Sequence, residues 1–163
     1  MTTSRSIRLT VDGITTDTGV DDDETLVDVL RDRLGSTAVR AGCRNGDCGT
    51  CTAVVDGTHL KTCLVPAARA DGTTVGTLAG DGSGRWVAPL RRAFMQEYAF
   101  QCGFCLPGMI LSAAALLDRD PHPDDAAIRD ALSGNLCRCT GYVNAVRAVR
   151  AVRSVGAPVS GHD

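Results

Sequence analysis

Two short cysteine motifs organise this chain, Cys102-Gly103-Phe104-Cys105 and Cys137-Arg138-Cys139, which together supply four thiols in the pattern C-x2-C and C-x1-C. A second set of four thiols lies upstream with the spacing C-x4-C-x2-C-x11-C, at Cys43, Cys48, Cys51 and Cys63. The two sets use all eight cysteines of the 163 residues, so none is left for a disulfide or a nucleophile. This division into four plus four is the strongest chemical signal in the sequence.

The upstream set has the spacing of plant-type [2Fe–2S] ferredoxins, in which a C-x4-C-x2-C run is joined by one distant cysteine. A short loop must then fold around two irons, so it needs residues that tolerate positive φ and let backbone N–H groups approach. Gly42, Gly46 and Gly49 meet this requirement. Structural zinc is the alternative, although zinc sites favour paired C-x2-C motifs. Disulfides are disfavoured because three cysteines within nine residues are poorly placed to bridge without strain.

The downstream set is compatible with iron or zinc on spacing alone. Two ligands in a C-x1-C motif would point to different faces of a helix. Cys137 and Cys139 are therefore expected on a turn between helices.

The residues around the downstream cysteines are more specific. They read Gln101-Cys102-Gly103-Phe104-Cys105-Leu106-Pro107-Gly108-Met109 and Gly134-Asn135-Leu136-Cys137-Arg138-Cys139-Thr140-Gly141-Tyr142. With these motifs, and with the upstream loop before them, the chain from about residue 6 to about residue 153 closely resembles the small iron–sulfur subunit of the molybdenum hydroxylases. That family includes xanthine dehydrogenase, aldehyde oxidoreductase and aerobic carbon monoxide dehydrogenase.

The resemblance implies an electron-transfer subunit and a set of ligands. Such a subunit relays electrons from molybdopterin (molybdenum) on a large partner, through two [2Fe–2S] clusters, to FAD on a medium partner. The first cluster, toward the flavin, is expected on Cys43, Cys48, Cys51 and Cys63. The second cluster, beside the pterin, is expected on Cys102, Cys105, Cys137 and Cys139. The family commonly forms a dimer of heterotrimers.

Other contacts with cofactors are also implied by the resemblance. Gln101 matches a glutamine whose side-chain amide binds the pterin, and the backbone N–H of Cys139 is a second expected contact with molybdopterin. Gly46 and Asp47 are expected to lie nearest the flavin.

The apolar pattern predicts an α+β chain of two small domains. In the first half, alternation at residues 6–12 and 14–20 indicates a hairpin, helical spacing runs from Leu26 to Leu34, and strands are expected at 52–55 and 60–65. This order is typical of a β-grasp, plant-type ferredoxin-like domain, predicted for residues 1–79. After a glycine-rich linker at 79–84 the chain reads as helix, and a four-helix bundle is predicted for residues 80–163.

The four expected helices run from Pro89 to Gln101, from Pro107 to Leu117, from Asp124 to Leu132 and from Thr140, as a cap, to Val152. Cys105 and Cys139 would then lie just before the second and fourth helices. Two helix N-termini, with their positive dipole ends, are therefore expected to point at the same cluster. Arg138 adds positive charge there, as Arg40 and Arg44 do beside the upstream loop.

Charge and composition exclude several other classes. The net charge of −2 offers no basic surface for nucleic acid, and no run of 18 apolar residues spans a membrane. The absence of a signal-peptide pattern, together with free thiols, indicates the cytoplasm. None of His59, His122 and His162 lies one or two residues from a cysteine, which excludes a Rieske centre. The chain has no phosphate loop or acid–base pair, so no catalytic centre of its own is expected.

Two other functions stay open at this point. One is a zinc-stabilised interaction module, which would be colourless. The other is a free-standing two-cluster ferredoxin, which would purify without molybdenum and flavin chains. In each case halves of about 80 residues have small cores, so metal binding is expected to stabilise them and the apoprotein to be partly unfolded.

Overall fold

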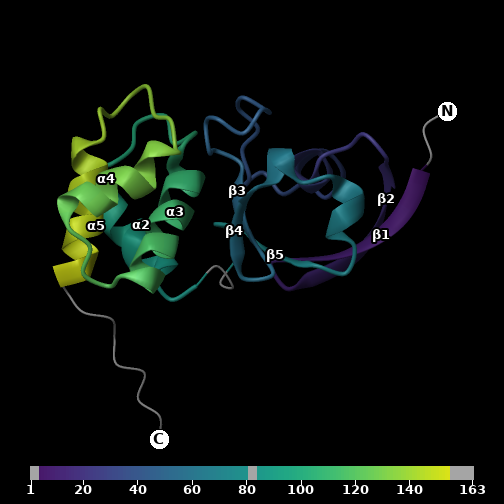
Figure 1. Cartoon of the computed structure of the whole chain (residues 1–163), viewed down its shortest axis with the longest axis horizontal. Coiled ribbons are helices and arrows are strands. Elements are labelled where there is room, and N and C mark those ends of the chain that lie inside the picture. The colour runs from purple at the N-terminus through teal and green to yellow at the C-terminus, as the bar shows by residue number, and fades with distance from the viewer. Residues whose placement is uncertain (1–3, 81–83, 155–163) are drawn as a thin grey trace, which may run out of the picture.

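The structure, a computed structural model, describes residues 4–80 and 84–154. Residues 81–83 of the predicted linker, and His162, lie outside the described residues. Two lobes lie side by side (Figure 1): a sheet lobe built from residues 4–80 and a helical lobe built from residues 84–154. The predicted α+β class, with a ferredoxin-like part followed by a helical part, is confirmed.

Five strands form the sheet lobe: β1 (Ser4–Val11), β2 (Ile14–Asp21), β3 (Thr52–Val55), β4 (Thr58–Lys61) and β5 (Thr74–Gly76). They pair in the order β2-β1-β5-β3-β4, with β1 parallel to β5 and the other pairs antiparallel. The β1–β2 hairpin turns at Asp12 and Gly13, whose φ angles of 49° and 85° suit a two-residue turn. The sequence did not reveal β5, because three residues are too few to show alternation.

The predicted helix at 26–34 is present and covers the sheet. It begins as α1 (Leu26–Asp28) and continues as a π-helical turn, η1 (Val29–Arg33). Thr25 and Asp28 form a capping box at its start, and Gly35, at φ 68°, follows its end. Its apolar side chains are fully buried in the core of the sheet lobe, at Leu26, Val27, Val29 and Leu30.

The strand predicted at 60–65 is wrong from residue 62 onward. β4 ends at Lys61, and Cys63 lies in a 3-10 turn, η2 (Thr62–Leu64). The reason is local hydrogen bonding: the hydroxyl and the backbone N–H of Thr62 both donate to the carbonyl of Cys51, at 2.8 and 3.3 Å. These bonds turn the chain back toward the upstream loop and place Cys63 beside Cys51. A second 3-10 turn, η3 (Ala67–Ala70), then leads to β5.

Four helices form the helical lobe, as predicted: α2 (Val87–Gln96), α3 (Leu106–Arg119), α4 (Asp125–Ser133) and α5 (Val143–Ser154). α3 packs against both α2 and α4, and α5 closes the bundle against α2 and α4 (Figure 1). α3 is the most buried of the four, with Met109, Ile110, Leu111 and Leu117 at 0–1 % exposure. Asp124 caps α4 by accepting a hydrogen bond from the N–H of Ala127 at 2.8 Å.

Two helix boundaries differ from the prediction. α2 ends at Gln96, so Tyr98, expected on its apolar stripe, is 80 % exposed at φ 51°. α5 begins at Val143 rather than after a Thr140 cap, and Tyr142 just before it has a φ of 67°. Val143 is 58 % exposed in consequence, whereas Ala145 and Ala148 are fully buried.

The two lobes pack together along one side of α3, which lies against β3 and β4 (Figure 1). Val54 of β3 and Leu78, from the sheet lobe, pack against the core of the helical lobe. Within residues 4–80 and 84–154, none of the helices has the length and apolar character needed to cross a lipid bilayer.

Candidate metal centres

The first cysteine loop, residues 40–51, brings Cys43 and Cys48 face to face. The backbone N–H of each residue donates to the sulfur of the other, at 3.3 Å in both directions. The N–H of Cys48, with further help from those of Asn45 and Asp47, lowers the pKa of the Cys43 thiol to about 6. N–H groups aimed at sulfur favour the thiolate, which is the form that binds metal.

Cys51 and Cys63 form a second thiol pair beneath this loop. Both are buried, at 2 % and 5 % exposure. Burial and the neighbouring Cys51 thiol raise the pKa of Cys63 to about 11, while the N–H of Gly46 opposes the rise. The charge of Cys43 also raises the pKa of Cys63, so Cys63 lies close to both Cys51 and Cys43. The loop and η2 thus bring the four predicted upstream ligands together as two pairs.

The three loop glycines are needed for different reasons. Gly46 and Gly49 have φ angles of 89° and 67°, as expected for positions that favour glycine. Gly42 has no positive φ, but a Cβ there would lie 2.8 Å from the sulfur of Cys48. A side chain at Gly42 would therefore collide with a predicted ligand.

The downstream set also forms two pairs. The sulfurs of Cys102 and Cys139 lie 3.8 Å apart, and both residues are exposed. The thiol of Cys102 raises the pKa of Cys139. Cys105 lies beside Cys137 and is 7 % exposed, and its burial raises its pKa to about 12.

Residues of the second cysteine loop, residues 134–142, favour the thiolate form of Cys137, which is the form that binds metal. Burial acts to raise its pKa, but hydrogen bonds outweigh this and the pKa is lowered. The hydroxyl of Thr140 donates to its sulfur at 3.1 Å, and the backbone N–H groups of Thr140 and Cys139 also contribute. Thr140, predicted as a helix cap, therefore donates a hydrogen bond to the Cys137 sulfur instead.

One of the two expected helix N-termini is found at the downstream set. Cys105 is the residue just before α3, and Pro107 lies in the first turn of that helix. α5 begins only at Val143, so its first turn does not follow Cys139 directly. The predicted turn between helices at Cys137 and Cys139 is correct.

The two cysteine loops are in direct contact. The backbone N–H of Leu136 donates to the carbonyl of Cys48 at 2.9 Å, and the side-chain amide of Asn135 donates to the carbonyl of Gly49 at 3.0 Å. A Cβ on Gly108, in the first turn of α3, would lie 2.2 Å from the same Gly49 oxygen. The contact therefore needs glycine at position 108.

Three residues of these contacts were missed by sequence reasoning. Asn135 is 2 % exposed, and its position within the downstream motif was a usable signal. Tyr142, the last residue of the second loop, holds this loop together: its hydroxyl accepts from the N–H of Cys137 at 2.8 Å and donates to the carbonyl of Asn135 at 3.0 Å. Lys61 donates from its ammonium group to the carbonyl of Gly46 at 2.6 Å.

The remaining predicted positions lie close to these loops. The side-chain amide of Gln101 donates to the carbonyl of Cys139 at 3.1 Å, so the structure brings these two residues together. Gly46 is buried and Asp47 is exposed, both on the first loop. Arg44 forms an ion pair with Asp28.

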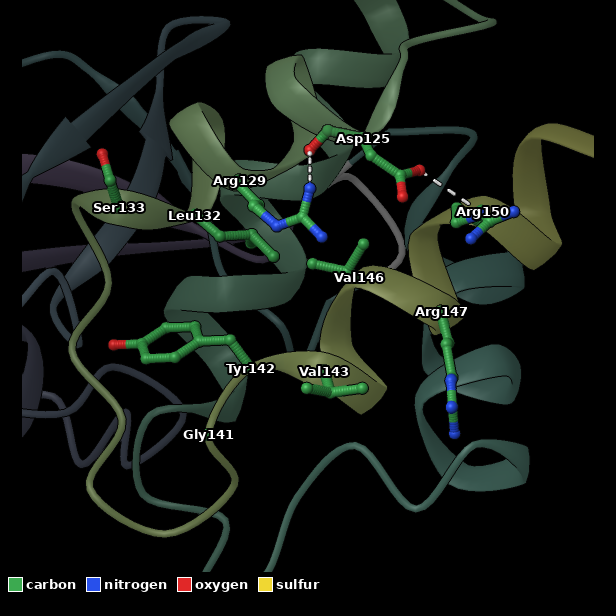
Figure 2. A pocket seen from close by; sticks show the side chains of 10 residues that line it. All are labelled: Asp125, Arg129, Leu132, Ser133, Gly141, Tyr142, Val143, Val146, Arg147 and Arg150. Atoms are coloured by element: carbon green, nitrogen blue, oxygen red, sulfur yellow. Dashed lines mark hydrogen bonds and ion pairs between the residues drawn. The ribbon is translucent and has the colours of Figure 1, made fainter.

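A pocket of about 450 Å³ between α4 and α5 contains none of the predicted ligands (Figure 2). Arg150 reaches Asp125 across it at 3.4 Å, and Val143 and Val146 form part of its apolar wall. Gly141 and Tyr142, at the end of the second loop, line the pocket as well. The pocket is therefore distinct from the thiols.

Both sets of thiols fit a two-iron cluster. Within residues 4–80 and 84–154, no three His, Cys, Asp or Glu side chains gather around a position for one metal ion. Each set presents two pairs of thiols with backbone N–H groups directed at sulfur. A [2Fe–2S] cluster takes four thiolates, two on each iron, and its sulfurs accept such hydrogen bonds.

The comparisons with known proteins agree with this chemistry. The 2Fe-2S iron-sulfur cluster binding domain matches residues 9–79, and the [2Fe-2S] binding domain matches residues 74–150. The chain is thus built from two iron–sulfur domains in tandem. The two matches overlap at β5, and the predicted boundary between residues 79 and 80 stays a prediction.

Individual relatives identify the family. The chain is 43% identical over 138 residues to the nicotinate dehydrogenase small FeS subunit of Eubacterium barkeri, covering 85% of this chain and 88% of the relative. It is 43% identical over 119 residues to the xanthine dehydrogenase iron-sulfur-binding subunit of Escherichia coli O157:H7, covering 72% and 74%. Quinoline 2-oxidoreductase from Pseudomonas putida 86 contains a chain of the same fold, with a TM-score of 0.83, 35% identity, and coverage of 95% and 99%.

The chain belongs to the family of small iron–sulfur subunits of molybdenum hydroxylases. It is therefore an oxidoreductase component with an electron-transfer role, and its relatives are subunits of larger assemblies.

Proposed function

We propose that the chain relays electrons between two cofactors held by partner chains. The donor is molybdopterin with its molybdenum on a large subunit, and the acceptor is FAD on a medium subunit. The chain contributes two [2Fe–2S] clusters, each of which carries one electron at a time when bound. The small-subunit relatives support larger partners, and we extend this to a cytoplasmic dimer of heterotrimers.

The thiol pairs of the structure suggest how the ligands are shared. Cys43 and Cys48 would hold one iron of the first cluster, and Cys51 and Cys63 the other. In the second cluster, Cys102 and Cys139 would share one iron, and Cys105 and Cys137 the other. Each iron then receives two thiolates, which is the arrangement that a [2Fe–2S] cluster requires.

The observation that carries the proposal is the hydrogen bond from Leu136 to Cys48. Leu136 is bonded to Cys137, a predicted ligand of the second cluster, and Cys48 is a predicted ligand of the first. A route of covalent bonds and one 2.9 Å hydrogen bond thus connects the two sets of thiols. Electronic coupling through bonds is stronger than through empty space, so this contact favours transfer between the clusters.

The exposure of the thiols supports the assignment of partners. Cys102 and Cys139 are exposed, whereas Cys51, Cys63 and Cys105 are buried. An exposed pair suits a face that a partner covers, and we assign this face to the molybdopterin subunit. The side-chain amide of Gln101, held at Cys139, would contact the pterin, and so would the backbone N–H of Cys139, which would then be shared with the Cys137 sulfur.

The first loop would face the flavin subunit. Gly46 and Asp47 lie between Cys43 and Cys48, so a cofactor near them would be close to the first cluster. For the domains, we assign residues 1–79 to the ferredoxin-like part and residues 80–163 to the helical part.

Metal analysis of the intact complex tests the proposal. We expect four irons per small subunit, no zinc, and two paramagnetic [2Fe–2S]⁺ signals after reduction. Zinc in place of iron would exclude the relay in favour of an interaction module. A subunit that purifies with iron but never with molybdenum and flavin chains would instead be a free-standing ferredoxin.

A further inference from the structure

Lys61 is the only lysine of the chain, whose other 16 basic residues are arginines. It is the last residue of β4 and half-buried, and its ammonium group lies 2.6 Å from the carbonyl oxygen of Gly46 on the first loop. None of the ion pairs found in the described parts of the chain involves Lys61. Its positive charge is therefore not neutralised by a carboxylate of the residues that the structure describes.

The hydrogen bond reaches a peptide group that serves the thiols. The carbonyl of Gly46 and the N–H of Asp47 belong to the same peptide plane. That N–H donates to the side-chain oxygen of Asn45 at 3.4 Å, and it also faces the Cys43 thiol and helps to lower its pKa, after the N–H groups of Cys48 and Asn45. An ammonium group on the carbonyl polarises the amide and strengthens its N–H as a donor, because hydrogen bonds in series reinforce one another.

The backbone N–H of Gly46 acts on a second thiol, that of Cys63. Burial raises the pKa of Cys63, and the N–H of Gly46 opposes this rise. By holding the Gly46 carbonyl, Lys61 fixes the segment whose N–H groups face two of the four upstream thiols. Lys61 is thus in a position to add both charge and order to the first loop.

Three arginines near the cysteines lack this arrangement. Arg40, at the start of the first loop, forms no ion pair within the described residues either, but its Nε is buried there without a hydrogen-bond partner. Arg44 is engaged with Asp28, which compensates its charge. Arg138, between two downstream thiols, is exposed, and its guanidinium makes no hydrogen bond or ion pair within the described residues. Lys61, which is hydrogen-bonded to the first loop and has no ion pair within the described residues, therefore distinguishes the upstream thiols from the downstream ones.

We propose that Lys61 raises the reduction potential of the first cluster relative to the second. Reduction adds one electron, and so one negative charge, to the cluster, and a fixed cation with N–H bonds to sulfur stabilises the added charge. This inference rests on the proposed relay. A higher potential at the first cluster would make transfer toward the flavin side favourable.

The test is a redox titration of the whole complex, followed by paramagnetic resonance of the two reduced clusters. A Cys43→Ser variant first identifies the signal of the first cluster, because a changed ligand alters that signal. In Lys61→Met we expect the reduced-to-oxidised ratio of the first cluster to fall about tenfold at a fixed potential, which corresponds to about 59 mV for a one-electron couple. The second cluster should change less than about threefold.

Two variants serve as controls. Lys61→Arg keeps the charge and should stay near wild type. Arg69→Met removes a cation from an exposed position on η3, with no side-chain bond in the described residues, and should change neither cluster. An unchanged first cluster in Lys61→Met, an equal shift in Lys61→Arg, or an equal shift of both clusters would each overturn the proposal.

Iron content is measured first, so that a failure of the relay itself is recognised separately. If Lys61→Met assembles no first cluster, the assembled wild-type complex can be modified instead. Acetylation removes the charge of Lys61 and of every other accessible amine of the complex, whereas reductive methylation keeps these charges. The Lys61→Arg complex treated in the same way is the control, because arginine reacts with neither reagent. A lower potential of the first cluster after acetylation of wild type but not of Lys61→Arg would support the proposal, and an equal change in the two complexes, or none in either, would refute it.

Discussion

The side-chain amide of Asn135 donates a hydrogen bond to the backbone carbonyl of Gly49, with an N–O distance of 3.0 Å. The two residues are 86 positions apart in the sequence, and the bond is buried. The same carbonyl also accepts from the hydroxyl of Thr52 at 2.8 Å. One oxygen of the first loop thus connects the sheet lobe with the second loop.

Removal of this amide is expected to weaken the packing of the two lobes. In Asn135→Ala the Gly49 carbonyl keeps its bonds to Thr52, so we expect a loss of about 1–2 kcal/mol, typical of one buried hydrogen bond. The measurement is thermal unfolding of the complex, followed by the visible absorbance of the clusters. The control Asn144→Ala changes a half-buried asparagine without a side-chain bond in the described residues. A melting temperature equal to that of the control would show that the bond contributes nothing.

Both sets of candidate ligands could be proposed from the sequence because each cysteine motif within them is short. Cys43, Cys48 and Cys51 lie on one loop, and such a loop keeps the same spacing wherever it occurs. Cys63 was predicted as a ligand, but its placement on a strand was wrong. Hydrogen bonds from Thr62 turn the chain before it, and hydropathy carries no trace of them.

Contacts between distant segments could not be predicted. Asn135 and Gly49 meet only because α3 lies against β3 and β4, and no periodic pattern encodes that approach. Lys61 resembled an ordinary strand-end lysine until its bond to Gly46 was seen. In the same way, the exposure of Tyr98 follows from where α2 ends rather than from its apolar spacing.

Tyr142 is expected to support the second cluster specifically. In Tyr142→Phe the N–H of Cys137 loses its acceptor and the carbonyl of Asn135 loses its donor, at a cost of about 1–3 kcal/mol. The second loop should then open more readily, and the paramagnetic signal of the second cluster should be lost first on mild heating. The control Tyr98→Phe removes the hydroxyl of an exposed tyrosine. Equal loss of both signals would contradict a local role.

His59 predicts a pH dependence of stability. Its Nε2 atom is buried and has no hydrogen-bond partner among the described residues, and burial lowers its pKa below the ordinary 6.5, although the charge of Asp118 opposes this. The unfolded chain therefore takes up the proton first as the pH falls. The contribution of neutral His59 to the free energy of unfolding is fully present above pH 6.5. It is lost as the pH falls from 6.5 toward the lowered pKa of His59 in the folded state.

The measurement compares melting temperatures of wild type and His59→Gln from about pH 5 to about pH 8, where histidine is the side chain that ordinarily titrates. The difference between them should grow in favour of the variant as the medium becomes acidic. His122→Gln, at an exposed position, should follow wild type throughout. Parallel curves for all three proteins would show that His59 is protonated equally well in the folded state.

Gln101 provides the last prediction, which concerns the face assigned to molybdopterin. Its amide is anchored to the carbonyl of Cys139, next to the exposed thiol pair. In Gln101→Ala we expect slower electron transfer out of the molybdenum site, by about 10–100-fold if a hydrogen-bonded contact of about 1.5–3 kcal/mol is lost. Both clusters should still assemble, with the full iron content.

Rapid mixing of the complex with its reducing substrate measures this rate, through the bleaching of cluster absorbance. Gln96→Ala is the matched control, because Gln96 is exposed at the end of α2 and its side chain makes no bond in the described residues. If Gln101→Ala bleaches as fast as this control while both retain their iron, the pterin lies elsewhere. Slower bleaching with a normal rate of reoxidation by the flavin would place the defect at the entry of electrons, where Gln101 meets Cys139.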